Sequence, residues 1–199
     1  MEYNYKEAIG KRRSIYELSK ESTISDDEIQ DILVYALDHT PSAFNSQSGR
    51  VVLLLDNEHN ELWLMIEEEL RKRVPAERFE STKKKMDGFR EAYGTVLFFE
   101  DYSIVEELEN KFPRYAHNFS PWSYQSSGML QYNIWTSFAI EGMGASLQHY
   151  NEVIEEAVKQ RWDIPSKWKL ISQMPFGKIK GGPGNKEIIP ADDKMKIFK

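Results

Sequence analysis

The sequence predicts an α+β protein in which helices flank a mixed sheet of about four strands, arranged in three layers. Two observations predict this fold. Short runs of branched aliphatic residues alternate along the chain with longer segments of helical period, and one such segment, 115–140, carries no formal charge although the chain is 29% charged. The alternation argues against an all-α protein, and about four strands are too few for a full doubly wound fold. We find no internal repeat, so we expect a single domain over residues 1–199.

Seven segments have helical period. They are residues 5–11, 25–40, 62–70, 76–93, 103–111, 123–141 and 151–162. The second opens with a capping box, Ser25-x-x-Glu28, and Pro41 ends it. The heavily charged segment 76–93 is typical of a solvated surface helix. Asn151 is expected to cap the last helix.

Four short segments are predicted to be strands, at residues 51–55, 95–99, 145–149 and 168–174. The first two are continuous apolar runs of the kind found in strands buried on both faces. A Gly- and Pro-rich stretch, 176–185, predicts a loop after the last strand. The polar tail beyond it is too short to fold alone, so we expect it to lie against something else.

The uncharged stretch is predicted to be a buried core helix. Leu130, Ile134 and Phe138 recur at i, i+4 and i+8, as on one face of a helix. A membrane span is excluded because Pro121 and many amides and serines interrupt the stretch. The glycines within 142–144 are expected to stop the helix, and the functional site is expected where it ends.

Composition excludes several classes of function. The chain has a net charge of −6, so nucleic acid is not an expected partner. It has no cysteine, and its four histidines lie too far apart for a metal-ligand motif. The N-terminal residues form no signal peptide or lipidation motif, so we expect a cytoplasmic protein.

Three loop motifs could bind a ligand. Arg12-Arg13-Ser14 offers guanidinium and hydroxyl donors to a phosphate, although such a triplet is more often a solvated helix end. The loop 41–47 could flank a planar polar ring or be a plain connection. The stretch 181–186 ends in Lys186 but lacks the following serine or threonine of a phosphate-binding P-loop.

The joint order of the motifs is more specific than any one of them. RRSxY near the N-terminus, PSAFNSQ after the capped helix, and a long helix running into GMGASLQHYN resemble the FMN-dependent nitroreductase family. The last motif is similar to the branch that holds copper-induced bacterial nitroreductases and fungal nitroreductases linked to fatty-acid regulation. The resemblance implies a nitroreductase-like three-layer sandwich with a sheet of about 4–5 strands, an interlocked homodimer and an FMN at each subunit interface.

The resemblance also implies roles for individual residues. The RRSxY motif and the end of the Gly-rich stretch would bind the FMN phosphate and ribityl chain, through Arg12, Arg13, Ser14 and Lys186. The partner chain would bring Pro41, Ser42 and Asn45 to the isoalloxazine, with Gln47 nearby. The segment Ser146, Leu147, Gln148, His149 and Tyr150 would run along the ring, with a backbone amide of His149 or Tyr150 near flavin N5. No side chain is expected to act as a catalytic group.

The family also implies the reaction. NAD(P)H and then a nitroaromatic or quinone would use one pocket in a ping-pong exchange, and no metal would take part. Phe44, Trp122 and Tyr124 could form a wall for planar substrates, although they could equally belong to the core. Tyr16 departs from the family, since many relatives have a lysine there, near the flavin N1/O2 edge. A flavin-binding stress or regulatory protein with incidental reductase activity is the alternative function.

Overall fold

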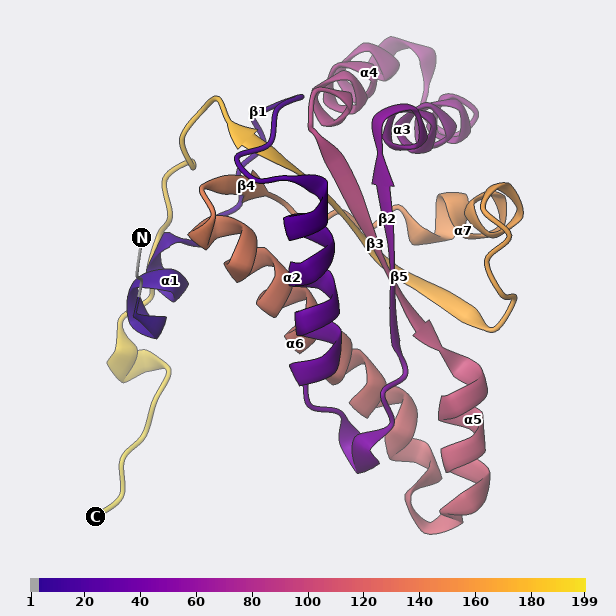
Figure 1. Ribbon diagram of the computed structural model, residues 1–199, viewed down its shortest axis with the longest axis vertical. Coiled ribbons are helices and arrows are strands. Elements are labelled where there is room, and N and C mark those ends of the chain that lie inside the picture. Colours follow the sequence, from indigo (N-terminus) through magenta and orange to yellow (C-terminus); the bar gives the residue numbers. More distant parts are fainter. Residues whose placement is uncertain (1–3) are drawn as a thin grey trace.

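The computed structural model describes residues 4–199 and shows a five-stranded open sheet (Figure 1). The strands are β1 (Leu18–Ser19), β2 (Gly49–Leu55), β3 (Gly94–Asp101), β4 (Met143–Ala145) and β5 (Trp168–Ile179). Their order is β1-β5-β3-β2, and β4 also pairs with β5. These strand pairs are antiparallel, and a parallel bridge between Ser14 and Ala145 makes the sheet mixed.

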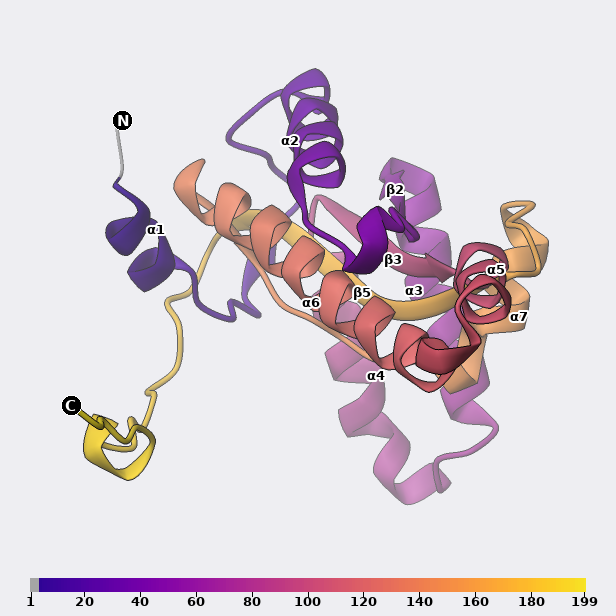
Figure 2. The same cartoon turned by 90° about the horizontal axis from the view of Figure 1, so that it is seen from below.

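Helices cover both faces of the sheet, which confirms the predicted α+β sandwich (Figure 2). The helices are α1 (Tyr5–Lys11), α2 (Asp26–His39), α3 (Asp56–Arg71), α4 (Ala76–Arg90), α5 (Tyr102–Lys111), α6 (Ala116–Ile140) and α7 (Asn151–Arg161), and α1 lies against α6, away from the sheet. Side chains alternate along β3, so Val96 and Phe98 pack towards α2 and α6, while Leu97 and Phe99 pack towards α3 and α7. The sheet therefore lies between two hydrophobic cores.

The capped second helix forms as predicted. Ser25 Oγ accepts a hydrogen bond from the Glu28 backbone at 3.3 Å, and Glu28 Oε2 accepts one from the Ser25 backbone at 2.8 Å. This reciprocal pair satisfies two backbone donors at the helix start. Thr40 is the C-cap, and Pro41 follows it.

The core helix is longer than predicted, because α6 begins at Ala116 and not at Ser123. Pro121 lies inside it and removes one backbone hydrogen bond. Phe119 is buried in this first part and packs edge-on against Trp122, at 5.4 Å between ring centroids. We infer that this packing compensates for the lost bond. The predicted buried positions Leu130, Ile134 and Phe138 are confirmed.

Two strand predictions are wrong in their limits. The run 145–149 is not itself a strand: β4 spans Met143–Ala145, because the turn at Gly142 (φ 81°) reverses the chain within two residues and leaves Gly144 inside the strand. Residues 146–149 continue beside β5 through a single bridge from Gln148 to Gln173. The second error is the loop at 176–185, since β5 runs to Ile179.

The start of α7 also differs from the prediction. Tyr150 is the N-cap, and Asn151 is the first helical residue. The Asn151 side chain donates to the Ile171 carbonyl at 2.6 Å and accepts from Gln173 Nε2 at 2.7 Å. It therefore bonds to β5 and does not cap the helix.

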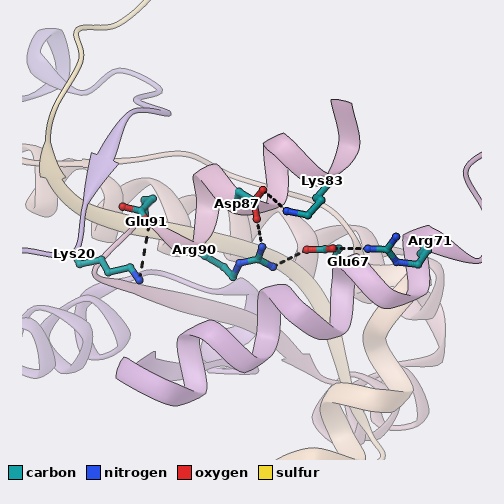
Figure 3. A network of polar contacts seen from close by, with 7 residues as sticks. All are labelled: Lys20, Glu67, Arg71, Lys83, Asp87, Arg90 and Glu91. Atoms are coloured by element: carbon teal, nitrogen blue, oxygen red, sulfur yellow. Dashed lines mark hydrogen bonds and ion pairs between the residues drawn. The ribbon is translucent and has the colours of Figure 1, made fainter. Parts of the chain in front are cut away.

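The charged helix α4 is a surface helix, but its inner side is not solvated as predicted. It buries three residues, Phe79, Met86 and Phe89. Arg90 bridges Asp87 on its own helix and Glu67 on α3, the latter at 2.7 Å (Figure 3). Arg71 and Lys83 extend the network to Glu67 at 2.8 Å and to Asp87 at 2.7 Å. The network joins α3 to α4 at the margin of the second core.

His59 is a buried histidine between α3 and β3. Its side chain is 1% exposed, and Nδ1 lies 2.9 Å from Thr95 Oγ1. Burial disfavours the imidazolium and lowers the pKa of His59 to about 4. The unfolded chain therefore binds a proton that the folded chain does not, between about pH 6.5 and pH 4.

We expect this histidine to make the fold sensitive to acid. Between pH 7 and pH 4.5 it should lower the free energy of unfolding by about 2 kcal/mol, since the stability that it contributes is lost as the pH falls towards 4. Urea unfolding of wild type and His59→Gln at both pH values measures the contribution. An equal loss in the two proteins would contradict it.

The C-terminal tail leaves β5 and runs past α1, away from the sheet (Figure 1). Its large apolar residues are exposed: Ile188, Ile189, Met195, Ile197 and Phe198. The tail therefore covers neither of the two hydrophobic cores of its own chain. No helix within residues 4–199 has the length and apolar character needed to cross a membrane.

Candidate functional site

The RRSxY motif and the Gly-rich stretch meet although about 170 residues separate them. Together they line a cavity of about 510 Å³, which we call the cationic cradle. Its lining is Arg12, Arg13, Ser14, Tyr16, Tyr132, Trp135, Gly184, Asn185 and Lys186. Five of the residues predicted to bind a cofactor thus lie in one cavity.

Arg12 is held flat against the core helix. Its guanidinium carbon lies 4.3 Å from the ring centroid of Trp135 and 5.5 Å from that of Tyr132. Its Nε is buried and has no hydrogen-bond partner among the described residues. A buried charged donor without a partner is costly, so the position suits an anion that supplies the acceptor.

Arg13 fixes the other wall of the cradle. Its Nη2 donates to the Gly184 carbonyl at 2.6 Å, which ties the Gly-rich stretch to the N-terminal motif. Lys186 follows two residues later and is exposed. Three cationic side chains therefore border the same cavity, in a chain whose net charge is −6.

The segment 145–149 adjoins the cradle directly. Ile15 donates its backbone N–H to the Ala145 carbonyl at 3.0 Å, next to the bridge from Ser14. The side chains of Ser146 and Gln148 are buried and bonded to each other at 3.1 Å, so they do not face a ligand. Only the backbone of these two residues could contribute to a site there.

The backbone amides of this segment alternate in direction. Those of Ser146 and Gln148 donate to β5 carbonyls at 3.3 and 2.7 Å, and that of Tyr150 donates to Gln173 Oε1 at 2.8 Å. The amides of Leu147 and His149 have no hydrogen-bond partner within residues 4–199. His149 is also exposed, so its N–H is free to donate to a ligand. The Tyr150 amide is already used.

The loop 41–47 has an unusual backbone. Phe44, Asn45 and Gln47 have φ values of 56°, 52° and 48°, which are strained for residues with a side chain, and most of all for phenylalanine. Ser42 Oγ accepts from the Gln47 backbone at 2.9 Å, and Arg50 Nη1 donates to the Gln47 carbonyl at 2.7 Å. These bonds hold the strained turn, and strain of this kind is frequent at binding sites.

A second cavity, of about 280 Å³, lies beside this loop. Pro41, Ser42 and Gln47 line it, while Asn45 is exposed to solvent. Glu100 at the end of β3 also lines it and is fully buried. Burial raises the pKa of Glu100 to about 7, against a hydrogen bond from Ser48 that favours the carboxylate.

The predicted aromatic wall is only partly assembled. Phe44 and Trp122 lie side by side, at 6.1 Å between ring centroids, and line a third cavity of about 320 Å³. Tyr124 lies apart from them, with its hydroxyl 3.4 Å from that of Tyr102. Residues two positions apart on a helix point to different sides, so Trp122 and Tyr124 cannot form one wall.

The cationic cradle and the loop 41–47 are far apart in one chain. Phe44 packs on Trp122, whereas Arg12 packs on Trp135 of the same helix. The two tryptophans lie thirteen positions apart on α6, which corresponds to roughly 20 Å. The two regions are therefore separate in one chain.

Sequence reasoning missed several residues of these sites, and four of them bear on the chemistry. Tyr132, Trp135 and Asn185 line the cradle, and Glu100 lines the cavity at the loop. The spacing of Tyr132 and Trp135 on the core helix marks a common face, but Arg12, which packs on that face, lies far from it in the sequence. No signal in the sequence separates Glu100 from the neighbouring surface carboxylates.

This fold is nitroreductase-like: an open, mostly antiparallel sheet lies between helices, with a cationic cradle near the end of the core helix. Residues 9–178 of the chain match the sequence model of the Nitroreductase family. The chain belongs to the nitroreductase family.

The similar proteins extend over nearly the whole chain. Nitroreductase FRM2 of Saccharomyces cerevisiae is 34% identical over 188 residues, which are 94% of this chain and 93% of that protein. Putative nitroreductase HBN1 of the same yeast is 35% identical over 198 residues, or 98% and 96% of the two chains. Nitroreductase CinD of Lactococcus lactis in complex with chloramphenicol superposes with a TM-score of 0.89 at 37% identity, covering 98% of this chain and 100% of that one.

Proposed function

We propose that the chain is an FMN-dependent oxidoreductase that uses NAD(P)H to reduce nitroaromatics or quinones. The observation that carries the proposal is the cationic cradle with the unpaired Nε of Arg12. Full-length relatives named as nitroreductases support an oxidoreductase activity.

The cradle residues suit the phosphate of FMN. Arg12 and Arg13 would offer planar donors, Ser14 a hydroxyl and Lys186 a mobile charge from the opposite side. The ribityl chain would leave towards segment 145–149, which adjoins the cradle through the bridge between Ser14 and Ala145. We place the Tyr16 side chain, which is 56% exposed, at the mouth of this cavity.

The free amides suit the edge of the isoalloxazine. Bound FMN would supply hydride transfer at its N5 atom. The N–H of His149 would donate a hydrogen bond near that atom, and the paired amides of Ser146 and Gln148 would keep the segment in place on β5. A fixed donor stabilises negative charge where it develops and needs no reorganisation.

The separation of the cationic cradle from the loop 41–47 supports an interlocked homodimer. In one chain the loop 41–47 lies roughly 20 Å along α6 from the cradle, so a second copy would supply Pro41, Ser42, Asn45 and Gln47 to each flavin. Exposed apolar side chains on α1 and α2, such as Tyr5, Val34 and Tyr35, would be covered by the partner. The apolar residues of the C-terminal tail would be covered in the same way.

We expect light scattering at low micromolar concentration to give twice the chain mass of 23.3 kDa. The reason is that the exposed apolar tail and the divided site both require a second copy. A monomer that still binds FMN tightly would contradict the proposed dimer site.

The third cavity, which Phe44 and Trp122 line, would bind the oxidant. Phe44 and Trp122 stack at an interplanar angle of 24° and could hold a planar ring in the cavity that they line. The similar protein CinD has been solved with chloramphenicol and with 4-nitrophenol, both nitro-substituted rings. We extend that substrate class to this chain, with quinones as the second class.

Spectroscopy tests the function. The purified protein should absorb as a flavoprotein, and anaerobic NADH or NADPH should bleach that absorbance. Added nitroaromatic or quinone should then restore it. A colourless chain that cannot be reconstituted with FMN would overturn the proposal, and flavin that neither nucleotide reduces would favour a flavin-binding stress or regulatory protein.

His149 is expected to contribute through its backbone alone. Its side chain is exposed, and hydride transfer needs no side-chain acid because water can supply the proton. His149→Ala should therefore retain FMN and lose less than about tenfold in turnover, or about 1.4 kcal/mol of barrier. Steady-state rates between pH 5.5 and 8.5 check this, and a hundredfold loss with an altered pH profile would show that the imidazole takes part.

A further inference from the structure

Glu100 is a carboxyl group built into the floor of the cavity beside the loop 41–47. It is the last residue but one of β3 and lines this cavity together with Ser126 and Leu130 of α6, and its side chain is fully buried. Ser48, also fully buried, donates its Oγ proton to Glu100 Oε2 at 2.6 Å. One oxygen of the carboxyl is thus fixed by the protein.

The other oxygen has no partner. Glu100 Oε1 is buried and makes no hydrogen bond within residues 4–199. Gly49 leaves room beside it, since a Cβ there would lie 3.8 Å from Oε1 and 3.1 Å from Leu130 Cδ2. A buried acceptor without a donor costs free energy, and a ligand with a donor would recover it.

The surrounding charges do not satisfy this oxygen. Arg50 on β2 is bonded to Asp101 at 3.0 Å. Lys169 on β5 lies opposite Glu100, but its Nζ is over the rings of Tyr102 and Tyr124. Asp38 on α2 is an exposed carboxylate on the cavity lining, and α6 has no lysine, arginine, aspartate or glutamate.

The cavity has the size and position of a substrate subsite. Its volume of about 280 Å³ is near the lower limit of ligand pockets, roughly 300 Å³, so it suits one aromatic ring. Ser126 lines both this cavity and the one between Phe44 and Trp122, so the two spaces adjoin. A ring held by the aromatic pair could therefore reach Glu100 with a substituent.

We infer that this cavity selects single-ring aromatic oxidants that carry a neutral O–H or N–H donor, and that Glu100 Oε1 accepts that hydrogen bond. The inference names the substrate class of the proposed reductase and rests on it for the role of the ligand. Glu100 acts here as a specificity-determining residue and takes no part in hydride transfer.

A matched pair of probes tests the inference. 4-Nitrobenzyl alcohol and its methyl ether differ in the O–H donor, and neither ionises between pH 5.5 and 8.5. Calorimetry on the oxidised, FMN-loaded protein without nucleotide gives the ratio of their dissociation constants. We expect the alcohol to bind about tenfold more tightly at pH 8.5, where the carboxylate accepts the bond. At pH 5.5 the ratio should fall below about threefold, because Glu100, with its pKa raised to about 7, is then protonated.

Two variants separate the carboxyl group from the general polarity of the cavity. Glu100→Gln retains the shape and an acceptor for Ser48, and should bring the ratio below about twofold at both pH values. Asp38→Asn removes the other carboxylate of the lining and should keep the wild-type ratio and its pH dependence. The pH series uses wild type alone, so it still tests the inference if Glu100→Gln does not fold.

Each other result overturns the inference. The inference is wrong if wild type binds the two probes equally or binds neither of them. It is also wrong if the ratio does not change with pH, or if Glu100→Gln retains the ratio. Calorimetry needs no turnover, so a protein that NADH and NADPH fail to bleach can still show the alcohol preference. Failure of the reductase proposal is therefore distinguishable from failure of the subsite.

Discussion

Arg12→Ala should weaken FMN binding by roughly ten- to hundredfold, since a charge-assisted hydrogen bond to phosphate contributes about 1.5–3 kcal/mol. Arg12 is the cradle residue with a buried, unpaired Nε, and two aromatic rings hold its guanidinium in place. Its position is therefore fixed before the ligand arrives, and little side-chain entropy is lost on binding. Quenching of flavin fluorescence during titration of the apo-protein measures the dissociation constant.

Two further variants make this result specific. Lys186→Ala should act on the same phosphate, so its effect should not add strictly to that of Arg12→Ala. Lys167→Ala removes a cation that is paired with Glu106 at 2.7 Å, outside the cradle, and should leave FMN affinity unchanged. An unchanged dissociation constant in Arg12→Ala, with urea unfolding as in wild type, would exclude the cradle as the phosphate site.

Local signals in the sequence predicted the elements well where one rule governs them. The capping box at Ser25 and the helical repeat of Leu130, Ile134 and Phe138 depend on neighbours within one or two turns, and both are confirmed. The limits of α6, β4 and β5 depend on packing with distant segments. The intrinsic secondary-structure propensities of Pro121 and Gly144 do not indicate such packing, so the predicted limits were wrong.

The candidate site divides in the same way. Arg12, Arg13 and Lys186 could be predicted because their motifs bear charge, and the structure places them in one cavity. Glu100 could not be predicted, since its burial follows from the antiparallel register of β3 with β2, which brings Ser48 to it. The chain has 32 acidic residues, and the sequence does not show that Ser48 is the partner of this one.

Gly177→Ala should destabilise the fold by about 3 kcal/mol, at the upper end of the usual cost of overpacking. Gly177 lies in β5, within the stretch that the sequence predicted to be a loop. A Cβ at this position would lie 2.5 Å from the Ser19 carbonyl oxygen and 2.9 Å from the Tyr93 backbone nitrogen. Both are backbone atoms, so neither can rotate away, and β1 or β5 must shift.

Gly88→Ala is the matched control for this substitution. Gly88 lies in α4 with nothing within 4 Å of the position of a Cβ, so alanine should stabilise the helix by about 0.5–1 kcal/mol. Urea unfolding of the two variants and wild type measures both effects. Because Gly177 pairs with Gly144 of β4, and Ala145 bridges to Ser14, a shift of β5 should also displace the cradle. We therefore expect Gly177→Ala to lower FMN affinity and Gly88→Ala to leave it unchanged, and equal stability of the two variants would show that the strand accommodates the methyl group.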